Sequence, residues 1–104
     1  MAEKSRQAVL EDMVRAKPDD AFSRYALAME LKGQGKNDEA LREFQTLTEK
    51  NPTYVATYLI YGQLLVNVGR SDDARKVLER GQGVAQKAGN MHAHSEISEL
   101  LATL

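Results

Sequence analysis

The chain has 104 residues, with 14 basic and 15 acidic side chains, a net charge of −1 at pH 7 and no cysteine. This length fits one domain with a modest core. The charges are intermixed, which excludes the basic stripe of a nucleic-acid binder, and the lack of cysteine excludes disulfides and thiolate metal sites. The first seven residues carry both charge signs and lead into no apolar segment, so we expect no secretory signal and a cytoplasmic protein.

Helical periodicity runs from end to end, and the breakers stand between the periodic segments. It predicts six helical segments. The first spans residues 4–16 and ends before Pro18, because the residue before a proline disfavours helical geometry. One side of it collects the apolar residues Val9, Leu10, Met13 and Val14.

The second helix is predicted at about residues 20–32, with Asp19 or Asp20 as its N-cap, and it runs into a glycine turn at residues 33–35. The third begins with Asn37 or Asp38 as a cap and extends to about residue 50. Its apolar side is predicted to consist of Ala40, Leu41, Phe44, Leu47 and Thr48.

The fourth helix is predicted at about residues 53–68, and its surroundings from 51 to 69 hold no charged residue. A membrane span is not expected, because polar residues interrupt the stretch and a helix of about 14 residues reaches only about 21 Å. A helix buried on several sides within a stack explains the composition. The fifth helix, from residue 72 with Ser71 as a cap, extends to about 88 despite Gly81 and Gly83. The sixth covers about 91–103.

A repeat of 34 residues organises these segments. The sequence from Gly35 to Ala40 returns as Gly69 to Ala74, with Pro18 returning as Pro52. A fixed period of this length predicts a stack of helical hairpins.

In this register the chain resembles the tetratricopeptide repeat family. In the first repeat, residues 21–54, the positions of the family pattern are occupied by Arg24, Leu27, Ala28, Leu31, Ala40, Phe44 and Pro52. In the second, residues 55–88, they are occupied by Tyr58, Tyr61, Gly62, Leu65, Ala74, Leu78 and Gln86. Residues 4–16 are similar to the second half of an earlier repeat, and residues 91–104 to the first half of a later one, acting as a capping helix. The resemblance implies a single all-α domain, 1–104, built as a right-handed superhelical stack of antiparallel hairpins.

Small residues are predicted where the helices of each hairpin cross, with Ala28 facing Ala40 and Gly62 facing Ala74. Three positions depart from the family pattern. Arg24 replaces a large apolar residue, Gln86 replaces the closing proline, and Gly81 stands where the preceding repeat has Leu47. We expect Gly81 to serve close packing, whereas Gly83 has no such reason.

The resemblance also implies a ligand surface, because the first helix of each hairpin lines the concave face in this family. The corresponding residues here are Phe22, Tyr25, Met29, Lys32, Ala56, Leu59, Gln63 and Asn67. They are mostly apolar, which disfavours a clamp for a peptide carboxylate and favours an apolar or amphipathic segment of a partner protein. The other reading is that a terminal helix folds over Tyr25, Met29 and Leu59, which makes them core.

No reactive constellation is apparent. His92 and His94 point about 200° apart on a helix and cannot share an ion, and His92 with Glu96 makes only half a metal site. We therefore predict no catalysis, no metal and no cofactor. The predicted function is a non-catalytic module that binds a protein or peptide, without nucleic acid or a membrane span. The alternative is a scaffold protein that self-associates through its terminal helices.

Overall fold

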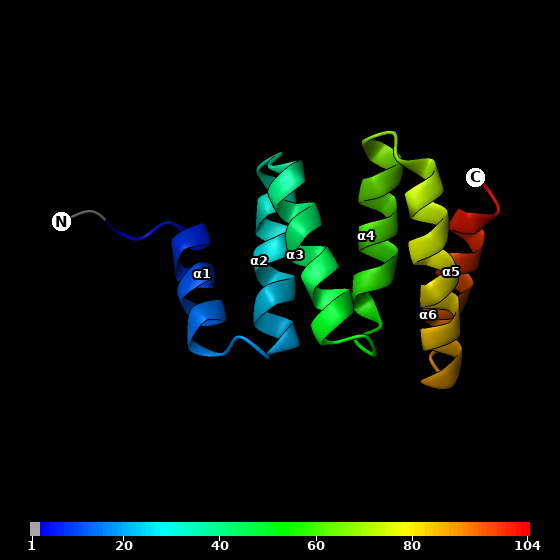
Figure 1. Ribbon diagram of the computed structural model, residues 1–104, viewed down its shortest axis with the longest axis horizontal. Coiled ribbons are helices and arrows are strands. Elements are labelled where there is room, and N and C mark those ends of the chain that lie inside the picture. The colour runs from blue at the N-terminus through cyan, green and yellow to red at the C-terminus, as the bar shows by residue number, and fades with distance from the viewer. Residues whose placement is uncertain (1–2) are drawn as a thin grey trace. The chain divides into compact units, whose positions relative to one another are not determined.

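The computed structural model describes residues 3–104, which contain helices and no strands. The helices are α1 (Arg6–Ala16), α2 (Ala21–Gly33), α3 (Asn37–Lys50), α4 (Ala56–Asn67), α5 (Ser71–Lys87) and α6 (Met91–Leu101) (Figure 1). They divide into two compact units, Met1–Asn51 and Pro52–Leu104. The predicted absence of a signal segment involves Met1 and Ala2, which lie outside the described residues.

Three helices begin with a side-chain cap. Ser5, Asp20 and Asn90 each accept a hydrogen bond from the backbone N–H three residues later, at 3.0–3.1 Å. Such caps satisfy an N–H that has no partner within the helix. The cap at Asp20 was predicted, and the cap at Ser5 starts α1 two residues later than expected.

The predicted caps of α3 and α5 are wrong, because Asn37 and Ser71 are already the first helical residues. The junction residues are Lys36 and Arg70, and neither makes a side-chain cap bond. The turn before them explains the difference.

In that turn, Gly35 and its counterpart Gly69 have φ angles of 76° and 83°, the left-handed region that favours glycine. The next N–H, from Lys36 or Arg70, returns to a carbonyl five residues earlier at 2.8–2.9 Å. This pattern closes one helix and leads directly into the next, so no residue is left to serve as a separate cap.

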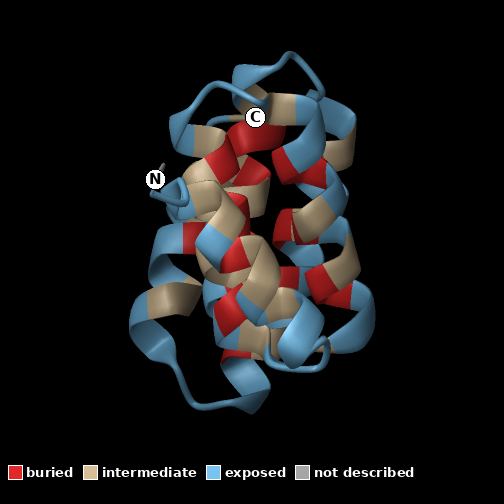
Figure 2. Cartoon of the chain, turned by 90° about the vertical axis from the view of Figure 1, so that its left-hand side faces the viewer, coloured by how far each residue is buried: buried red, intermediate tan, exposed pale blue. Residues whose placement is uncertain are grey.

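Unit Met1–Asn51 consists of α1 packed on α2, and α2 packed on α3. The five predicted apolar-side residues of α3 are all buried, and Phe44 and Leu47 are fully enclosed. On α1 the prediction is only partly correct. Leu10 is buried, but Val9 and Met13 are 44% and 40% exposed, because α2 packs on α1 without fully covering these two side chains. Figure 2 shows the buried residues on the inner sides of the helices.

Unit Pro52–Leu104 packs α4 against α5 and both against α6. Its core centres on Tyr58, Leu78 and Ile97, one from each helix, and all three are fully buried. Gly81 serves close packing as expected, since a Cβ there would lie 2.5 Å from the Cβ of Tyr58.

Gly62 is also buried, but the atoms nearest to a Cβ there belong to Leu78 and not to Ala74. The added Cβ would lie 2.4 Å from Leu78 Cδ2, so α5 approaches α4 through a leucine that fills the space above the glycine. The small residue is required as predicted, although its partner is different. No helix within residues 3–104 combines the length and the apolar content needed to cross a membrane.

Candidate functional site

The first row of predicted ligand residues lies on α2, where Phe22, Tyr25, Met29 and Lys32 follow each other at helical spacing. Phe22 is 63% exposed, and the other three are half-buried. Tyr25 also packs edge-on against Phe44 of α3, with ring centroids 6.4 Å apart and planes at 66°. Tyr25 therefore belongs partly to the core and partly to the surface, and this contact holds its ring in place.

The second row lies on α4. Ala56 and Asn67 are exposed, while Leu59 and Gln63 are half-buried. Leu59 packs against the core cluster of Tyr58, Leu78 and Ile97, so much of its side chain is committed to folding. The two rows belong to different units, and a groove that joins them stays a prediction.

Two hydrogen bonds fix the starts of the helices that carry the rows. Arg24 Nη2 donates to the carbonyl of Pro18 at 3.2 Å, and Arg24 Nη1 contacts Glu43 Oε1 of α3 at 2.8 Å. In the second unit Tyr58 Oη donates to the carbonyl of Pro52 at 2.5 Å. The unexpected Arg24 thus ties together the loop before α2, α2 itself and α3.

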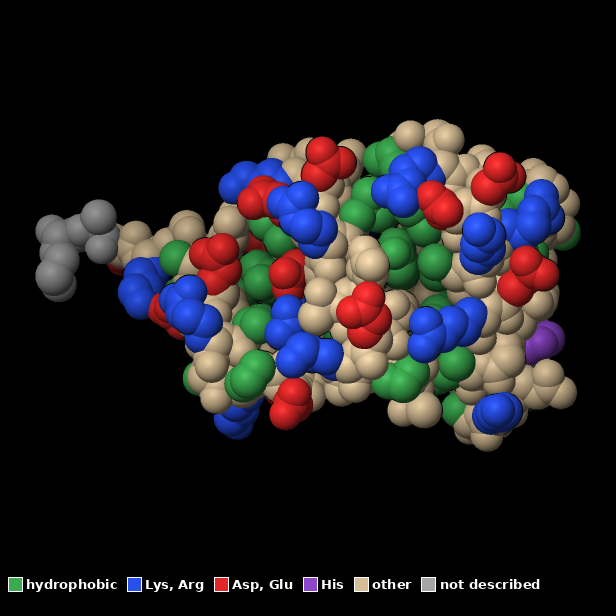
Figure 3. Space-filling model, in the orientation of Figure 1, with side chains coloured by type: hydrophobic (Ala, Val, Ile, Leu, Met, Phe, Trp, Pro, Cys, Tyr) green, Lys and Arg blue, Asp and Glu red, His purple; other side chains and the backbone are tan. Residues whose placement is uncertain are grey.

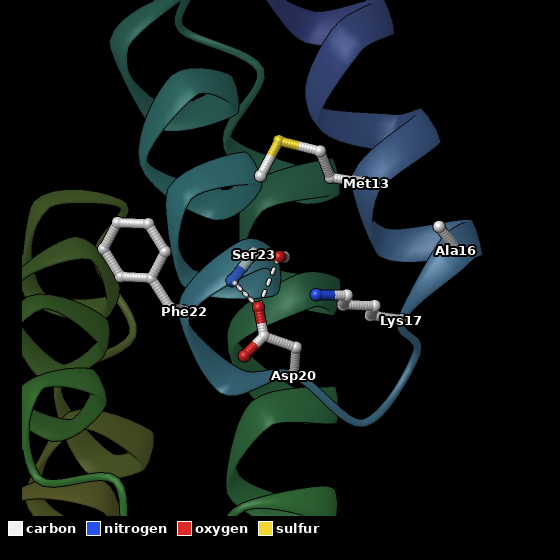
Figure 4. A pocket seen from close by; sticks show the side chains of 6 residues that line it. All are labelled: Met13, Ala16, Lys17, Asp20, Phe22 and Ser23. Atoms are coloured by element: carbon white, nitrogen blue, oxygen red, sulfur yellow. Dashed lines mark hydrogen bonds between the residues drawn. The ribbon is translucent and has the colours of Figure 1, made fainter.

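A cavity of about 240 Å³ opens between α1 and α2. Its lining is mostly apolar and consists of Met13, Ala16, Lys17, Asp20, Phe22 and Ser23. Figure 4 shows Met13 reaching from α1 toward α2, with the ring of Phe22 pointing away from α1. Sequence reasoning missed this cavity because it assigned Met13 to the packed side. The signal was the pair Val9 and Met13, two large apolar residues one turn apart on α1.

Each resolved pKa shift in residues 3–104 has a structural cause. The hydrogen bond from Lys4 lowers the pKa of Asp12, with Arg15 adding to the effect, and the hydrogen bond from the Ser23 hydroxyl lowers the pKa of Asp20. Burial raises the pKa of Tyr58. Ion pairing, helix capping and core packing account for all three shifts, so none of them indicates a catalytic group.

Of the two histidines, His92 contacts the carboxylate of Glu96, one helical turn later. His92 Nε2 lies 3.0 Å from Glu96 Oε1, and no group of three or more metal-ligating side chains gathers in the part of the chain that the structure describes. On the face drawn in Figure 3, acidic and basic side chains alternate over both units, without a large patch of one sign.

Comparisons with known proteins agree with this fold. The model of the tetratricopeptide repeat family matches residues 31–102. A tetratricopeptide repeat domain protein from Salinibacter ruber is 36% identical, and its crystal structure aligns over 81% of this chain and 93% of that chain with a TM-score of 0.77. The solution structure of that domain aligns over 84% and 88%, with a TM-score of 0.79.

A protein from Bordetella parapertussis shares the fold at 24% identity. Its solution structure aligns over 97% of this chain and 88% of that chain, with a TM-score of 0.80. None of the curated proteins compared with the chain matches it.

Proposed function

The chain belongs to the tetratricopeptide repeat family, whose members generally mediate protein–protein contacts, and we propose that it binds an apolar or amphipathic peptide segment of a partner protein without catalysis. The observation that carries this proposal is Phe22. Phe22 is 63% exposed and lies on the same helix face as Tyr25 and Met29. An exposed aromatic side chain of this kind is a suitable anchor for a ligand.

Charge supports an apolar ligand. Among the eight residues of the two rows, Lys32 is the one cation, and it stands beside apolar neighbours. Recognition of a terminal carboxylate needs several convergent donors, because a charged group is otherwise desolvated without compensation. The rows supply apolar contact area instead.

The inner residues of the rows favour binding for a second reason. Tyr25 is already held by Phe44, and Leu59 by the core of its unit, so a ligand that contacts them restricts little additional side-chain motion. Preorganisation of this kind reduces the entropic cost of association. Within the α2 row Tyr25 is therefore the preorganised residue and Phe22 the exposed one, and within the α4 row Leu59 is the preorganised residue.

A display selection tests the ligand class. A random peptide library presented to the whole chain is expected to enrich sequences with aliphatic or aromatic residues at helical or regular spacing. Enrichment of acidic peptides that require a free C-terminal carboxylate would contradict the proposal, because the rows would then work as a clamp.

Exposed substitutions test the surface. Phe22→Ser with Ala56→Glu changes one exposed residue in each row, so the fold should be retained, which circular dichroism checks. The selected peptides are expected to bind this variant at least about tenfold more weakly, since it loses an anchor and gains a desolvated charge. Met91→Ser removes another exposed apolar residue, outside both rows, and should leave binding unchanged.

The alternative of self-association through the terminal helices receives little support from α6, whereas α1 exposes Val9 and Met13. The exposed positions of α6 are largely polar, and Met91 is the one large apolar side chain exposed on this helix. A polar outer surface is typical of a helix that caps a repeat array. A mass that doubles with concentration in light scattering would nevertheless favour this alternative.

A further inference from the structure

The volume of the cavity between α1 and α2, about 240 Å³, limits what it can hold. Whole small-molecule ligands occupy pockets of roughly 300–1,000 Å³, so this cavity is too small for most of them. An apolar cavity of roughly 150 Å³ is enough for a benzene ring. The space between α1 and α2 therefore fits one large side chain of a ligand whose remainder lies outside.

The walls of the cavity favour an aromatic group. Met13 reaches from α1 toward α2, Ala16 contributes a methyl group at the end of α1, and Phe22 lines the cavity from α2 (Figure 4). A thioether makes favourable contacts with aromatic rings, and its unbranched chain adapts to the shape that it meets. A pair of aromatic rings also gains more than its buried area alone provides. Met13 and Phe22 thus offer a ring more than they offer an aliphatic chain.

The polar groups of the lining do not select a charged ligand. Lys17 and Asp20 carry opposite charges, so the lining has no net charge. The backbone N–H and the hydroxyl of Ser23 both donate to the Asp20 carboxylate, and these two donors are not available to a ligand. Water against the apolar walls is poorly held, and an apolar group that displaces such water gains affinity.

Phe22 connects the cavity with the proposed ligand surface. It lines the cavity and it also begins the α2 row, which continues with Tyr25 and Met29. Ser23, the next residue of α2, already belongs to the lining. A peptide that follows the row and passes over Phe22 therefore reaches the cavity with a neighbouring side chain.

We propose that the cavity between α1 and α2 receives one aromatic side chain of the peptide that binds the α2 row, and that this side chain is the main anchor of the peptide. The inference rests on the proposed function and adds to it the place and the chemical type of the anchor. An aliphatic side chain and a free aromatic compound are the other possible occupants, and the experiments below distinguish them.

Capped amino acids test the cavity without any peptide. The N-acetyl amides of phenylalanine, leucine and alanine are titrated into the whole chain, isotope-labelled at the methionine methyl groups for NMR. Met13 reports on the cavity, Met29 on the α2 row, and Met91 on an exposed site elsewhere. The phenylalanine amide is expected to shift Met13 saturably and at lower concentration than the leucine amide does. The alanine amide should leave Met13 unchanged, and Met91 should respond to none of the three.

Two substitutions change the volume of the cavity in opposite directions. Ala16→Leu fills part of it from an exposed position at the end of α1, and Met13→Ala enlarges it by removing the thioether. Ala16→Leu should weaken the phenylalanine amide at least about tenfold, because burial of an aromatic side chain contributes roughly that factor or more. Met13→Ala should move the preference from phenylalanine toward the larger tryptophan, measured on peptides that carry either residue as the anchor.

Matched controls make the same changes away from the cavity. Ala88→Leu adds the same side chain at an exposed alanine that follows α5, and Met91→Ala removes another exposed methionine side chain. Both variants should bind as the wild type does. Circular dichroism checks that all four variants are folded, and Met13→Ala tests the proposal even if Ala16→Leu folds poorly.

The peptides enriched by display then identify the anchor. Each aromatic residue of a selected peptide is replaced in turn by alanine, and fluorescence anisotropy measures its affinity for the wild type and for Ala16→Leu. One replacement should weaken binding to the wild type at least about tenfold and have little further effect on Ala16→Leu, in which the cavity is already filled. This lack of additivity assigns that residue to the cavity.

The outcomes separate this proposal from the proposed function. Equal shifts of Met13 with the phenylalanine and alanine amides would overturn the anchor, and tighter binding of the leucine amide would make the occupant aliphatic and overturn its aromatic type. Peptides that bind the rows with an affinity unaffected by Ala16→Leu would overturn the anchor and leave the proposed function in place. Binding of the phenylalanine amide at Met13 without any binding of peptides would overturn the proposed function and the peptide anchor together, with a free aromatic compound as the occupant.

Discussion

Arg24 and Tyr58 occupy equivalent positions in the two repeats, and each donates a hydrogen bond to the carbonyl of the proline six residues earlier. The distances are 3.2 Å to Pro18 and 2.5 Å to Pro52. A guanidinium in the first repeat and a phenol in the second thus bind the proline carbonyl of the loop that precedes α2 or α4. The residue opposite differs accordingly, since Glu43 faces the cation.

Replacing Arg24 and Glu43 by the residues at the equivalent positions of the second repeat should preserve the stability of the first unit. Arg24→Tyr alone leaves Glu43, which is only 23% exposed, without its cation and should lower the free energy of unfolding by about 2 kcal/mol. Adding Glu43→Val places in the first repeat the residues that the second has at these positions, Tyr58 and Val77, of which Val77 packs against the cluster that contains Tyr58, and it should recover most of the loss. Urea denaturation of both single variants and the double variant gives the coupling energy.

Lack of coupling would contradict this expectation. If the two single losses simply add, then Arg24 and Glu43 stabilise the unit independently, and the structural correspondence with Tyr58 and Val77 has no energetic counterpart. Glu49→Val, at an exposed position of the same helix, controls for the general effect of adding a valine.

Removing the phenol of Tyr58 should be mild at neutral pH. Tyr58→Phe deletes the bond to the Pro52 carbonyl while keeping the ring, at a cost of about 1 kcal/mol. Burial raises the pKa of Tyr58 above its ordinary 10.0, although the positive charge of Arg80 opposes the shift. The wild type therefore has a stability contribution that is complete below pH 10 and is lost as pH rises through the raised pKa.

The stability difference between wild type and Tyr58→Phe should accordingly narrow above pH 10. Denaturant titrations at neutral pH and in steps above pH 10 measure it. A difference that stays constant over this range would mean that the hydroxyl ionises equally in the folded and unfolded states.

The helical fold was predictable because breakers and apolar periodicity agree in this chain. The 34-residue repeat and the close packing at Gly81 were both predictable from local residue types. A glycine in a helix interior destabilises the helix, so its presence indicates a packing requirement. The caps of α3 and α5 were predicted wrongly from residue type, because the turns at Gly35 and Gly69 already determine how the next helix begins. Asn37 is a good cap by residue type but stands one position too late.

The candidate site was less predictable for a physical reason. Sequence periodicity identifies an apolar face, but it does not say whether another helix covers that face. Met13 and Leu47 are equivalent in the repeat, and yet one is 40% exposed and the other fully buried. The same ambiguity applies to Tyr25, whose contact with Phe44 depends on tertiary packing.

Asp20 provides an acid-sensitive cap for α2. The backbone N–H and the hydroxyl of Ser23 both donate to its carboxylate, and the hydroxyl bond is the largest cause of its lowered pKa. The group therefore adds stability above its unfolded pKa of 3.8, and this contribution is lost as pH falls through the lowered folded pKa.

Asp20→Asn keeps an acceptor for the cap but does not titrate. The difference in free energy of unfolding between the wild type and this variant should shrink as pH falls below about 3.8. Ser23→Ala should raise the pKa of Asp20 toward its ordinary value, which an NMR titration of the carboxyl carbon detects. An unchanged pKa would show that the hydroxyl bond does not stabilise the carboxylate.

The two interior glycines of α5 should respond oppositely to alanine. A Cβ at Gly81 would lie 2.5 Å from Tyr58 Cβ and 3.2 Å from Ile97 Cδ1. The Cβ of Tyr58 is fixed to its backbone and cannot rotate away, so Gly81→Ala should force α4 from α5 and cost about 1–3 kcal/mol. At Gly83 a Cβ meets nothing within 4 Å, and Gly83→Ala should stabilise the helix by up to about 1 kcal/mol.

Each substitution is the control for the other, because the same change is made two residues apart in one helix. Thermal and urea unfolding of the two variants measure the difference in sign. A destabilised Gly83→Ala would show that the exposed position has a function in the folded unit that its open surroundings do not explain. A neutral Gly81→Ala would show that α4 and α5 separate readily, which is incompatible with a fully buried Tyr58 as the rigid centre of the unit.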